Sequence, residues 1–89
     1  MSEKDPLGMK YFERSENAIA IIAAMLGRNL RQIMAEEKKV PADSKKLKEL
    51  YDEESKYLSE REAVYSGDAA VQERVIREYS PLLLANGTD

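Results

Sequence analysis

One stretch near the start of the chain constrains the fold more than any other. Between Met9 and Lys39 the sequence contains no proline, and its one glycine is Gly27. Large apolar residues recur every seven positions, at Phe12, Ile19, Leu26, Ile33 and, directly after the stretch, Val40. This spacing places side chains on one face of an α-helix and does not fit the two-residue period of a strand. A glycine inside a helix costs only about 1 kcal/mol, so the stretch predicts one helix of about 30 residues, about 45 Å long.

The rest of the chain carries two sets of helix-ending signals. Val40 precedes Pro41 and therefore avoids the helical conformation, and Asp43 or Ser44 can cap a second helix over about 45–65. Ser66-Gly67-Asp68 is typical of a glycine that ends one helix and a cap that starts the next. A third helix is predicted over about 69–79. Ser80-Pro81 then predicts a separate short turn at 82–84 that ends at Asn86-Gly87.

These elements predict an all-α fold in a single domain, 1–89, with a helix start at Asp5-Pro6 and frayed ends at 1–5 and 86–89. A compact chain of this length has a radius of gyration near 12 Å, which a helix of about 45 Å exceeds. A long antiparallel helical hairpin plus a short third helix is therefore expected. Such a hairpin leaves one side of its core uncovered, and without Cys there is no disulfide to stabilise it. We expect dimerisation to complete a helical bundle.

The first helix has apolar residues on more than one side. A helical wheel predicts a core face made of Phe12, Ile19, Ile22, Ala23, Leu26, Leu30 and Ile33. A second apolar face lies beside it and consists of Ala18, Ile21, Ala24 and Met25. Two interpretations of this second face remain open: the third helix and residues 82–84 cover it, or the chain associates with itself there. Asn29, at the edge of the core face, either fixes the register of the helices or reaches solvent.

The second helix carries charges inside its apolar face. Tyr51, Tyr57 and Tyr65 share that face, and Glu54 and Arg61 fall in its middle. A buried charge without a partner is costly, so each is expected to pair with the first helix (Arg14, Glu16 or Glu37) or with a second copy, or else to extend into water. The predicted partner-binding residues of the two helices are Ala18, Ile21, Ala24, Met25, Tyr51, Glu54, Tyr57, Arg61 and Tyr65.

Several chemistries are disfavoured by composition. The chain has neither His nor Cys, so the commonest general base, the best nucleophile and the usual zinc ligands are missing. The acidic runs 36–37 and 52–54 are contiguous, and their side chains diverge around a helix instead of converging on a metal. No phosphate-binding loop, dinucleotide fingerprint or calcium-binding loop occurs. We therefore predict no catalytic activity, no cofactor and no metal site.

Basic residues gather in the middle of an otherwise acidic chain with a net charge of −3. A patch of this kind is what phosphate contacts require, although no aromatic residue interleaves with it and the pI is near 5.1. The candidate nucleic-acid-binding residues are Arg28, Arg31, Lys38, Lys39, Lys45, Lys46 and Lys48.

These observations favour a small non-catalytic protein–protein interaction module: a regulator, an inhibitor, an antitoxin-like factor or an assembly chaperone. The expected partners are a second copy of the chain, as a homodimer, and another protein that the sequence does not identify. A nucleic-acid-binding regulator is the alternative. The charged N-terminus does not resemble a signal peptide, and the longest uncharged run, 18–27, is shorter than the roughly 20 residues that span a bilayer. We therefore expect a cytoplasmic protein without membrane contact.

Overall fold

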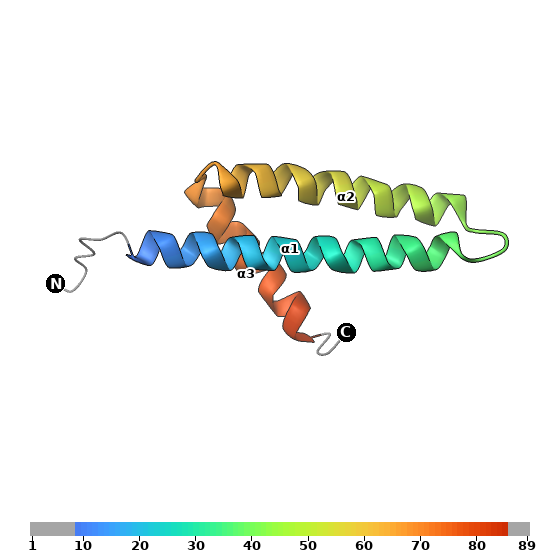
Figure 1. The fold of residues 1–89 in the computed structure, drawn as a ribbon, viewed down its shortest axis with the longest axis horizontal. Coiled ribbons are helices and arrows are strands. Elements are labelled where there is room, and N and C mark those ends of the chain that lie inside the picture. The colour runs from blue at the N-terminus through green and yellow to red at the C-terminus, as the bar shows by residue number, and fades with distance from the viewer. Residues whose placement is uncertain (1–8, 86–89) are drawn as a thin grey trace.

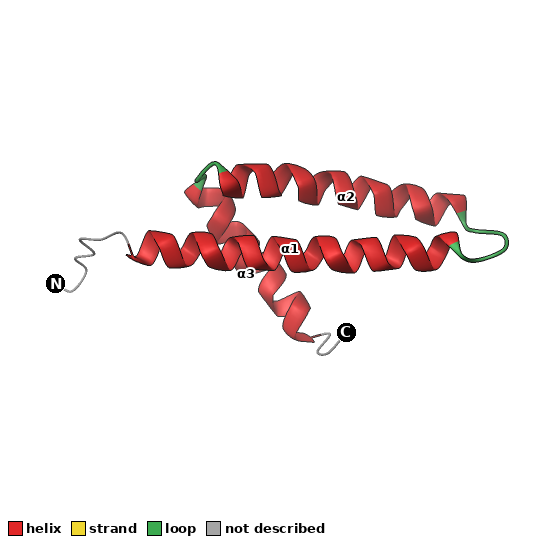
Figure 2. Ribbon diagram, in the orientation of Figure 1, coloured by secondary structure: helices red, strands yellow, loops and turns green. Residues whose placement is uncertain are grey.

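The computed structural model describes residues 9–85 and consists of three helices: α1 (Met9–Glu37), α2 (Ser44–Tyr65) and α3 (Ala69–Ala85). α1 and α2 form a long antiparallel hairpin, and α3 crosses behind α1 (Figure 1). Residues 9–85 contain no strand (Figure 2). The predicted all-α hairpin with a third helix is therefore confirmed. The expected helix start at Asp5-Pro6, the frayed ends and the Asn86-Gly87 stop lie outside the described residues.

The turn between α1 and α2 is held by two carboxylates. An oxygen of Asp43, the N-cap of α2, accepts hydrogen bonds from the backbone N–H groups of Lys45 and Lys46 at 3.0 and 3.1 Å. Glu36, near the end of α1, accepts a hydrogen bond from the backbone N–H of Asp43 at 3.0 Å. The cap that starts α2 is thereby tied to the end of α1, which keeps the hairpin closed at its tip.

The turn between α2 and α3 follows the predicted glycine signal. Gly67 has a φ of 90°, a left-handed conformation that favours glycine. Its N–H donates to the carbonyl of Val64, and the N–H of Asp68 donates to the carbonyl of Ala63, both at 3.1 Å. The Asp68 side chain then accepts a hydrogen bond from the N–H of Val71 at 3.2 Å. One residue pair thus ends α2 and starts α3.

The end of α3 corrects the sequence prediction. We predicted a helix to about residue 79 and a separate turn at 82–84, but α3 runs continuously to Ala85 with Pro81 inside it. An interior proline removes one helical hydrogen bond and costs about 3 kcal/mol. Tyr79 before it and Leu83 after it both pack against the hydrophobic core, and these contacts hold the helix together across Pro81.

The hydrophobic core lies where α3 crosses the hairpin. Its buried residues come from all three helices: Ala18, Ile22, Met25, Val64, Val75 and Tyr79. The rings of Tyr57 and Tyr79 meet edge to face, with their centroids 5.5 Å apart. α3 therefore completes a core on one side of the hairpin.

The face of α1 that is buried differs from the predicted one. The buried residues are Ala18, Ile22, Met25, Asn29, Ile33 and Glu36. Ile22 and Ile33 were predicted correctly, whereas Phe12, Ala23 and Leu30 are exposed and Ile19 and Leu26 are half-buried. Two causes shift the core. α3 covers the side that holds Ala18 and Met25, and Asn29 is drawn inward because its Nδ2 donates to the carbonyl of Leu50 at 3.0 Å.

Candidate protein-binding face

The side of the hairpin opposite α3 is rich in exposed apolar side chains. On α1, Phe12 is 53% exposed, Leu30 50% and Met34 48%; on α2, Tyr65 is 62% exposed. We call this surface the open face. Its apolar residues on α1 are Phe12, Ile19, Ala23, Leu26, Leu30 and Met34, of which the half-buried Ile19 also packs against the core. The exposed Glu16 and Glu37 share this side of α1. Its residues on α2 are Leu47, Tyr51, Glu54, Leu58, Arg61 and Tyr65.

Helix geometry places both sets on one side. In α1, Met25 faces the core that α3 completes. At about 100° per residue, Met25 lies to one side of Ile22 around the helix, and the open-face residues of α1 lie to the other side. In α2, Glu60 forms hydrogen bonds with α3 and lies to one side of Leu50 around the helix. The open-face residues of α2 lie to the other side of Leu50. The Tyr51 hydroxyl donates a hydrogen bond to the Glu37 carboxylate, which joins the two helices along this side. α3 lies behind the hairpin in Figure 1, so the open face is toward the viewer.

Part of the predicted partner-binding surface is occupied within the chain. Ala18 is fully buried and Met25 is 4% exposed, both in the core beside α3. Ile21 and Tyr57 are half-buried against the same core, and Ala24 is exposed on α1. The placement of Ala18 and Met25 on a binding surface is therefore wrong. α3 covers them, as the first of the two interpretations of the second apolar face proposed.

Four other predicted residues lie on the open face. Tyr51 is 43% exposed, and its pKa is raised mainly by its hydrogen bond to Glu37. Tyr65 and Arg61 are exposed, Glu54 is half-buried, and Leu58 lies between these two charges at 40% exposure. Within residues 9–85 the side chains of Glu54 and Arg61 form no hydrogen bond or ion pair. A shallow groove of about 440 Å³ runs past Leu58, Arg61 and Tyr65.

Sequence reasoning missed the apolar majority of this face. Phe12, Leu30 and the half-buried Leu26 were assigned to the core. Leu58 was assigned to the apolar face of the second helix without a binding role, and Met34 was not singled out. The seven-residue spacing of Phe12, Ile19 and Leu26 identified a continuous stripe, but it did not indicate which neighbour covers that stripe. The position of α3 decides this, and α3 lies on the other side of the hairpin.

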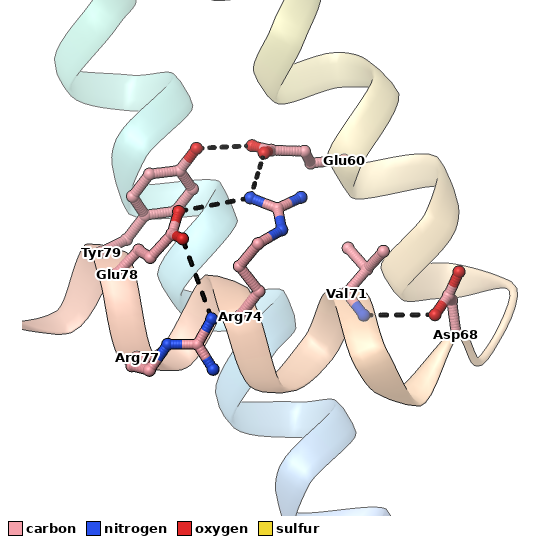
Figure 3. Close-up of polar contacts among 7 residues, drawn as sticks. All are labelled: Glu60, Asp68, Val71, Arg74, Arg77, Glu78 and Tyr79. Atoms are coloured by element: carbon pink, nitrogen blue, oxygen red, sulfur yellow. Dashed lines mark hydrogen bonds and ion pairs between the residues drawn. The ribbon is translucent and has the colours of Figure 1, made fainter.

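On the side opposite the open face, polar side chains attach α3 to α2 (Figure 3). Glu60, which is 7% exposed, accepts hydrogen bonds from the Tyr79 hydroxyl at 2.8 Å and from Arg74 Nη1 at 2.9 Å. Burial and the hydrogen bond to Glu60 raise the pKa of Tyr79, and the bond to Glu60 also raises the pKa of Arg74. Arg74 further contacts Glu78 at 3.4 Å. This network positions a helix and leaves no free reactive group.

Gln72 joins all three helices at the same crossing and is fully buried. Its Nε2 donates to the carbonyl of Val64 and to Ser15 Oγ, both at 3.0 Å. Its Oε1 accepts a hydrogen bond from Arg14 Nε at 2.8 Å. Every polar atom of the amide is therefore satisfied. This role of Gln72 could not be predicted from the sequence.

The candidate nucleic-acid-binding residues are spread over the tip of the hairpin and along α1. Lys38, Lys45 and Lys46 are exposed at the tip, whereas Lys39 pairs with Glu36 and Lys48 with Asp52, each at 3.0 Å. Arg31 is exposed on α1 and Arg28 is half-buried. The pKa of Glu36 is lowered, first by the backbone hydrogen bond from Asp43 and then by Lys39. A groove of about 360 Å³ at this end is lined by both lysines and glutamates, Lys39, Lys46, Glu36, Glu49 and Glu53 among them. The tip is therefore mixed in charge.

Within residues 9–85, no group of three or more acidic side chains is placed to hold a metal ion. Residues 12–37 of α1 are long and apolar enough to cross a membrane by length and composition, a test that the core helix of a soluble protein also passes. Comparison of the chain with protein-family models, with curated proteins and with solved structures finds no match.

Proposed function

We propose that this chain is a small, non-catalytic, cytoplasmic protein–protein interaction module that binds protein through its open face. One observation carries the proposal. Six large apolar side chains on one side of the hairpin are between 40% and 62% exposed: Phe12, Leu30, Met34, Tyr51, Leu58 and Tyr65. A contiguous exposed apolar surface is typical of a binding site on a soluble protein. The absence of His and Cys supports a role as a regulator, inhibitor or assembly factor instead of an enzyme.

The chemistry of the open face favours protein over lipid or nucleic acid. Tyrosines with accessible hydroxyls and isolated charges within an apolar surface are typical of protein interfaces. Glu54 would be costly against lipid chains because a carboxylate there loses its water. Nucleic acid requires several cations, whereas Arg61 is the one basic residue of this face.

Affinity capture with matched variants tests the proposal. The tagged chain is incubated with an extract of the cells that produce it, and retained proteins, including untagged copies of the chain, are quantified by mass spectrometry. Leu30→Lys/Leu58→Lys places two charges on the open face. Leu84→Lys is the control, because Leu84 is 81% exposed on α3 and lies outside that face. We expect specific proteins to be retained by the wild type and the control but lost by the double variant. Identical retention by all three would contradict the proposal.

A further inference from the structure

We propose that the protein bound by the open face is a second copy of this chain, packed antiparallel with α2 against α2 and α1 against α1. The inference rests on the proposed function in that it uses the same face, but it commits to one occupant. In this arrangement the two hairpins form a double layer with their tips at opposite ends. Each α3 lies on the outside, where it already covers its own hairpin.

The open face of α2 is self-complementary about Leu58. Tyr51 and Tyr65 each lie seven residues from Leu58, one on either side. Glu54 lies four residues before Leu58 and Arg61 three residues after it. A two-fold axis through Leu58 therefore brings Glu54 of each copy opposite Arg61 of the other, twice. These two charges have no hydrogen bond or ion pair within residues 9–85, so the second copy supplies what the single chain lacks.

On α1, several residues of the open face likewise lie at similar distances before and after one central residue, Ala23. Phe12 and Met34 each lie eleven residues from Ala23. Ile19 lies four residues before it and Leu26 three residues after it. A two-fold axis through Ala23 pairs Phe12 with Met34 and Ile19 with Leu26, and it places Leu30 opposite the exposed Glu16 of the other copy. The small Ala23 at the centre permits close approach of the two backbones.

One axis serves both helices, because the two centres lie at nearly the same level. Gln72 bonds to both Ser15 and Val64, which places these residues opposite each other on α1 and α2. Asn29 lies opposite Leu50 through its hydrogen bond. This register places Leu58 opposite residue 21, two positions from Ala23, or about 3 Å along the helix. A second copy requires the centres of symmetry on α1 and α2 to lie at the same level along the hairpin, because one two-fold axis must pass both. A partner with another sequence would not require this.

The size of the open face is sufficient for a dimer. α2 has 22 residues, and a surface two helices wide along its length measures roughly 33 Å by 20 Å, or about 660 Å². Stable interfaces bury about 800 Å² of accessible surface per partner, so the area is of the right order. The chain is also flat, with extents of 60 × 26 × 15 Å and a radius of gyration of 16.0 Å, against about 12 Å for a compact chain of this length. A second copy packed on the open face would increase the shortest dimension and make the assembly more compact than the single chain.

Charge reversal tests the pairing directly. Glu54→Arg and Arg61→Glu each place like charges opposite each other at two symmetric positions, and the double variant Glu54→Arg/Arg61→Glu restores opposite charges. We expect each single variant to weaken dimerisation about tenfold or more and the double variant to recover it. Dissociation constants are measured by analytical ultracentrifugation, and circular dichroism verifies that each variant is folded. Arg77→Glu is the control, because Arg77 is exposed on α3.

Single cysteines test the position of the axis independently, because the chain has no Cys of its own. Leu58→Cys lies on the axis, and we expect oxidised glutathione to convert it to a disulfide-linked dimer. Leu84→Cys lies off the open face and should form far less. A wild type that is monomeric throughout, single charge variants without effect, or equal cross-linking at both positions would overturn the proposal.

The second copy can fail while the proposed function stands. If the chain is monomeric and the Leu30→Lys/Leu58→Lys variant loses a different captured protein, the face binds protein but not itself. A monomer that binds phosphatidylcholine vesicles through this face, and captures no protein, would overturn both proposals.

Discussion

The two sides of the α1–α2 hairpin carry similar apolar residues, but these residues are buried on one side and exposed on the other. On the side that α3 covers, Ile22 and Val75 are fully buried, and Gln72 and Glu60 have hydrogen-bond partners. On the open face, Leu30 and Phe12 remain about half exposed, and Glu54 and Arg61 have no hydrogen-bond or ion-pair partner within residues 9–85. α1 contributes apolar residues to both sides, so the comparison shows that a side chain's environment depends on which neighbour it meets.

The covered side also carries the polar contacts that make the fold specific. An apolar helix can pack in several rotations, whereas a buried amide or carboxylate tolerates only those that satisfy its hydrogen bonds. Gln72 fixes the rotation and level of the helices in this way. Asn29 contributes through the hydrogen bond from its Nδ2 to the carbonyl of Leu50, although its buried Oδ1 accepts no hydrogen bond within residues 9–85. The open face has no comparable buried polar group within residues 9–85, so its specificity for a partner depends on Glu54 and Arg61.

The largest difference between the two sides is expected for truncated apolar residues. Ile22→Ala creates a cavity in the core and should lower the free energy of unfolding by about 3 kcal/mol. Leu30→Ala removes a side chain that is 50% exposed and should cost less than about 1 kcal/mol in the monomer. Urea denaturation followed by circular dichroism at low protein concentration measures both. Equal losses would show that the open face is part of the folding core of the single chain.

Tyr79→Phe should destabilise the covered side in a way that depends on pH. At neutral pH we expect a loss of about 1–2 kcal/mol, because a buried oxygen of Glu60 loses its donor. Burial and Glu60 raise the pKa of Tyr79 in the folded state. The stability from the neutral phenol is therefore complete below about pH 10, the unfolded value, and is lost as the pH rises above it.

The difference between the wild type and Tyr79→Phe should consequently shrink between about pH 8 and about pH 11. Urea denaturation at both values measures it, and Tyr65→Phe on the open face is the control. A difference that is the same at both values would show that the hydroxyl of Tyr79 is not desolvated by the packing of α3 against the hairpin.

Substitutions at two glycines, one in a turn and one inside a helix, should change stability with opposite signs. Gly67→Ala places a side chain at a φ of 90°, so it should cost about 1 kcal/mol at the turn that directs α3 to the covered side. Gly27→Ala should instead stabilise the chain by up to about 1 kcal/mol, because Gly27 lies inside α1. Its added Cβ would meet only Arg31 Nη1, at an ordinary 3.6 Å. Thermal unfolding measures both, and destabilisation by Gly27→Ala would contradict an ordinary helical environment at Gly27.

The smallest effect is expected at the tip, which belongs to neither side. Fluorescence polarisation with duplex and hairpin oligonucleotides should show no micromolar binding at about 150 mM salt, so Lys45→Ala/Lys46→Ala should change nothing. Binding by the wild type that weakens in this variant, with a salt slope smaller by about one per lost phosphate contact, would favour the nucleic-acid alternative over the open face.

The helices and their turns could be predicted from the sequence because their signals are local. Asp43 caps the residues next to it, and the left-handed Gly67 ends the helix that it follows. The rotation of α1 could not be predicted, because its middle is apolar on all sides and the contacts that decide its orientation are distant in sequence. Asn29 bonds to Leu50 and Gln72 bonds to Ser15, across 21 and 57 residues.

The same reason limited the prediction of the binding face. On α2 the wheel placed Tyr51, Glu54 and Arg61 together, and the structure places all three on the open face. On α1 the rotation was unknown, so Ala18 and Met25 were assigned to the binding surface although α3 buries them. The continuity of α3 past Pro81 was equally hidden, because it depends on the packing of Leu83 against the core.

The mass of the unmodified chain in solution shows whether the open face binds a second copy. Size-exclusion chromatography with light scattering, over a concentration series up to about 100 μM, reports whether a second copy covers the open face. We predict twice the chain mass of 10.1 kDa at the upper concentrations, falling toward the single-chain mass on dilution or in Leu58→Glu. A mass of 10.1 kDa at every concentration would contradict the claim.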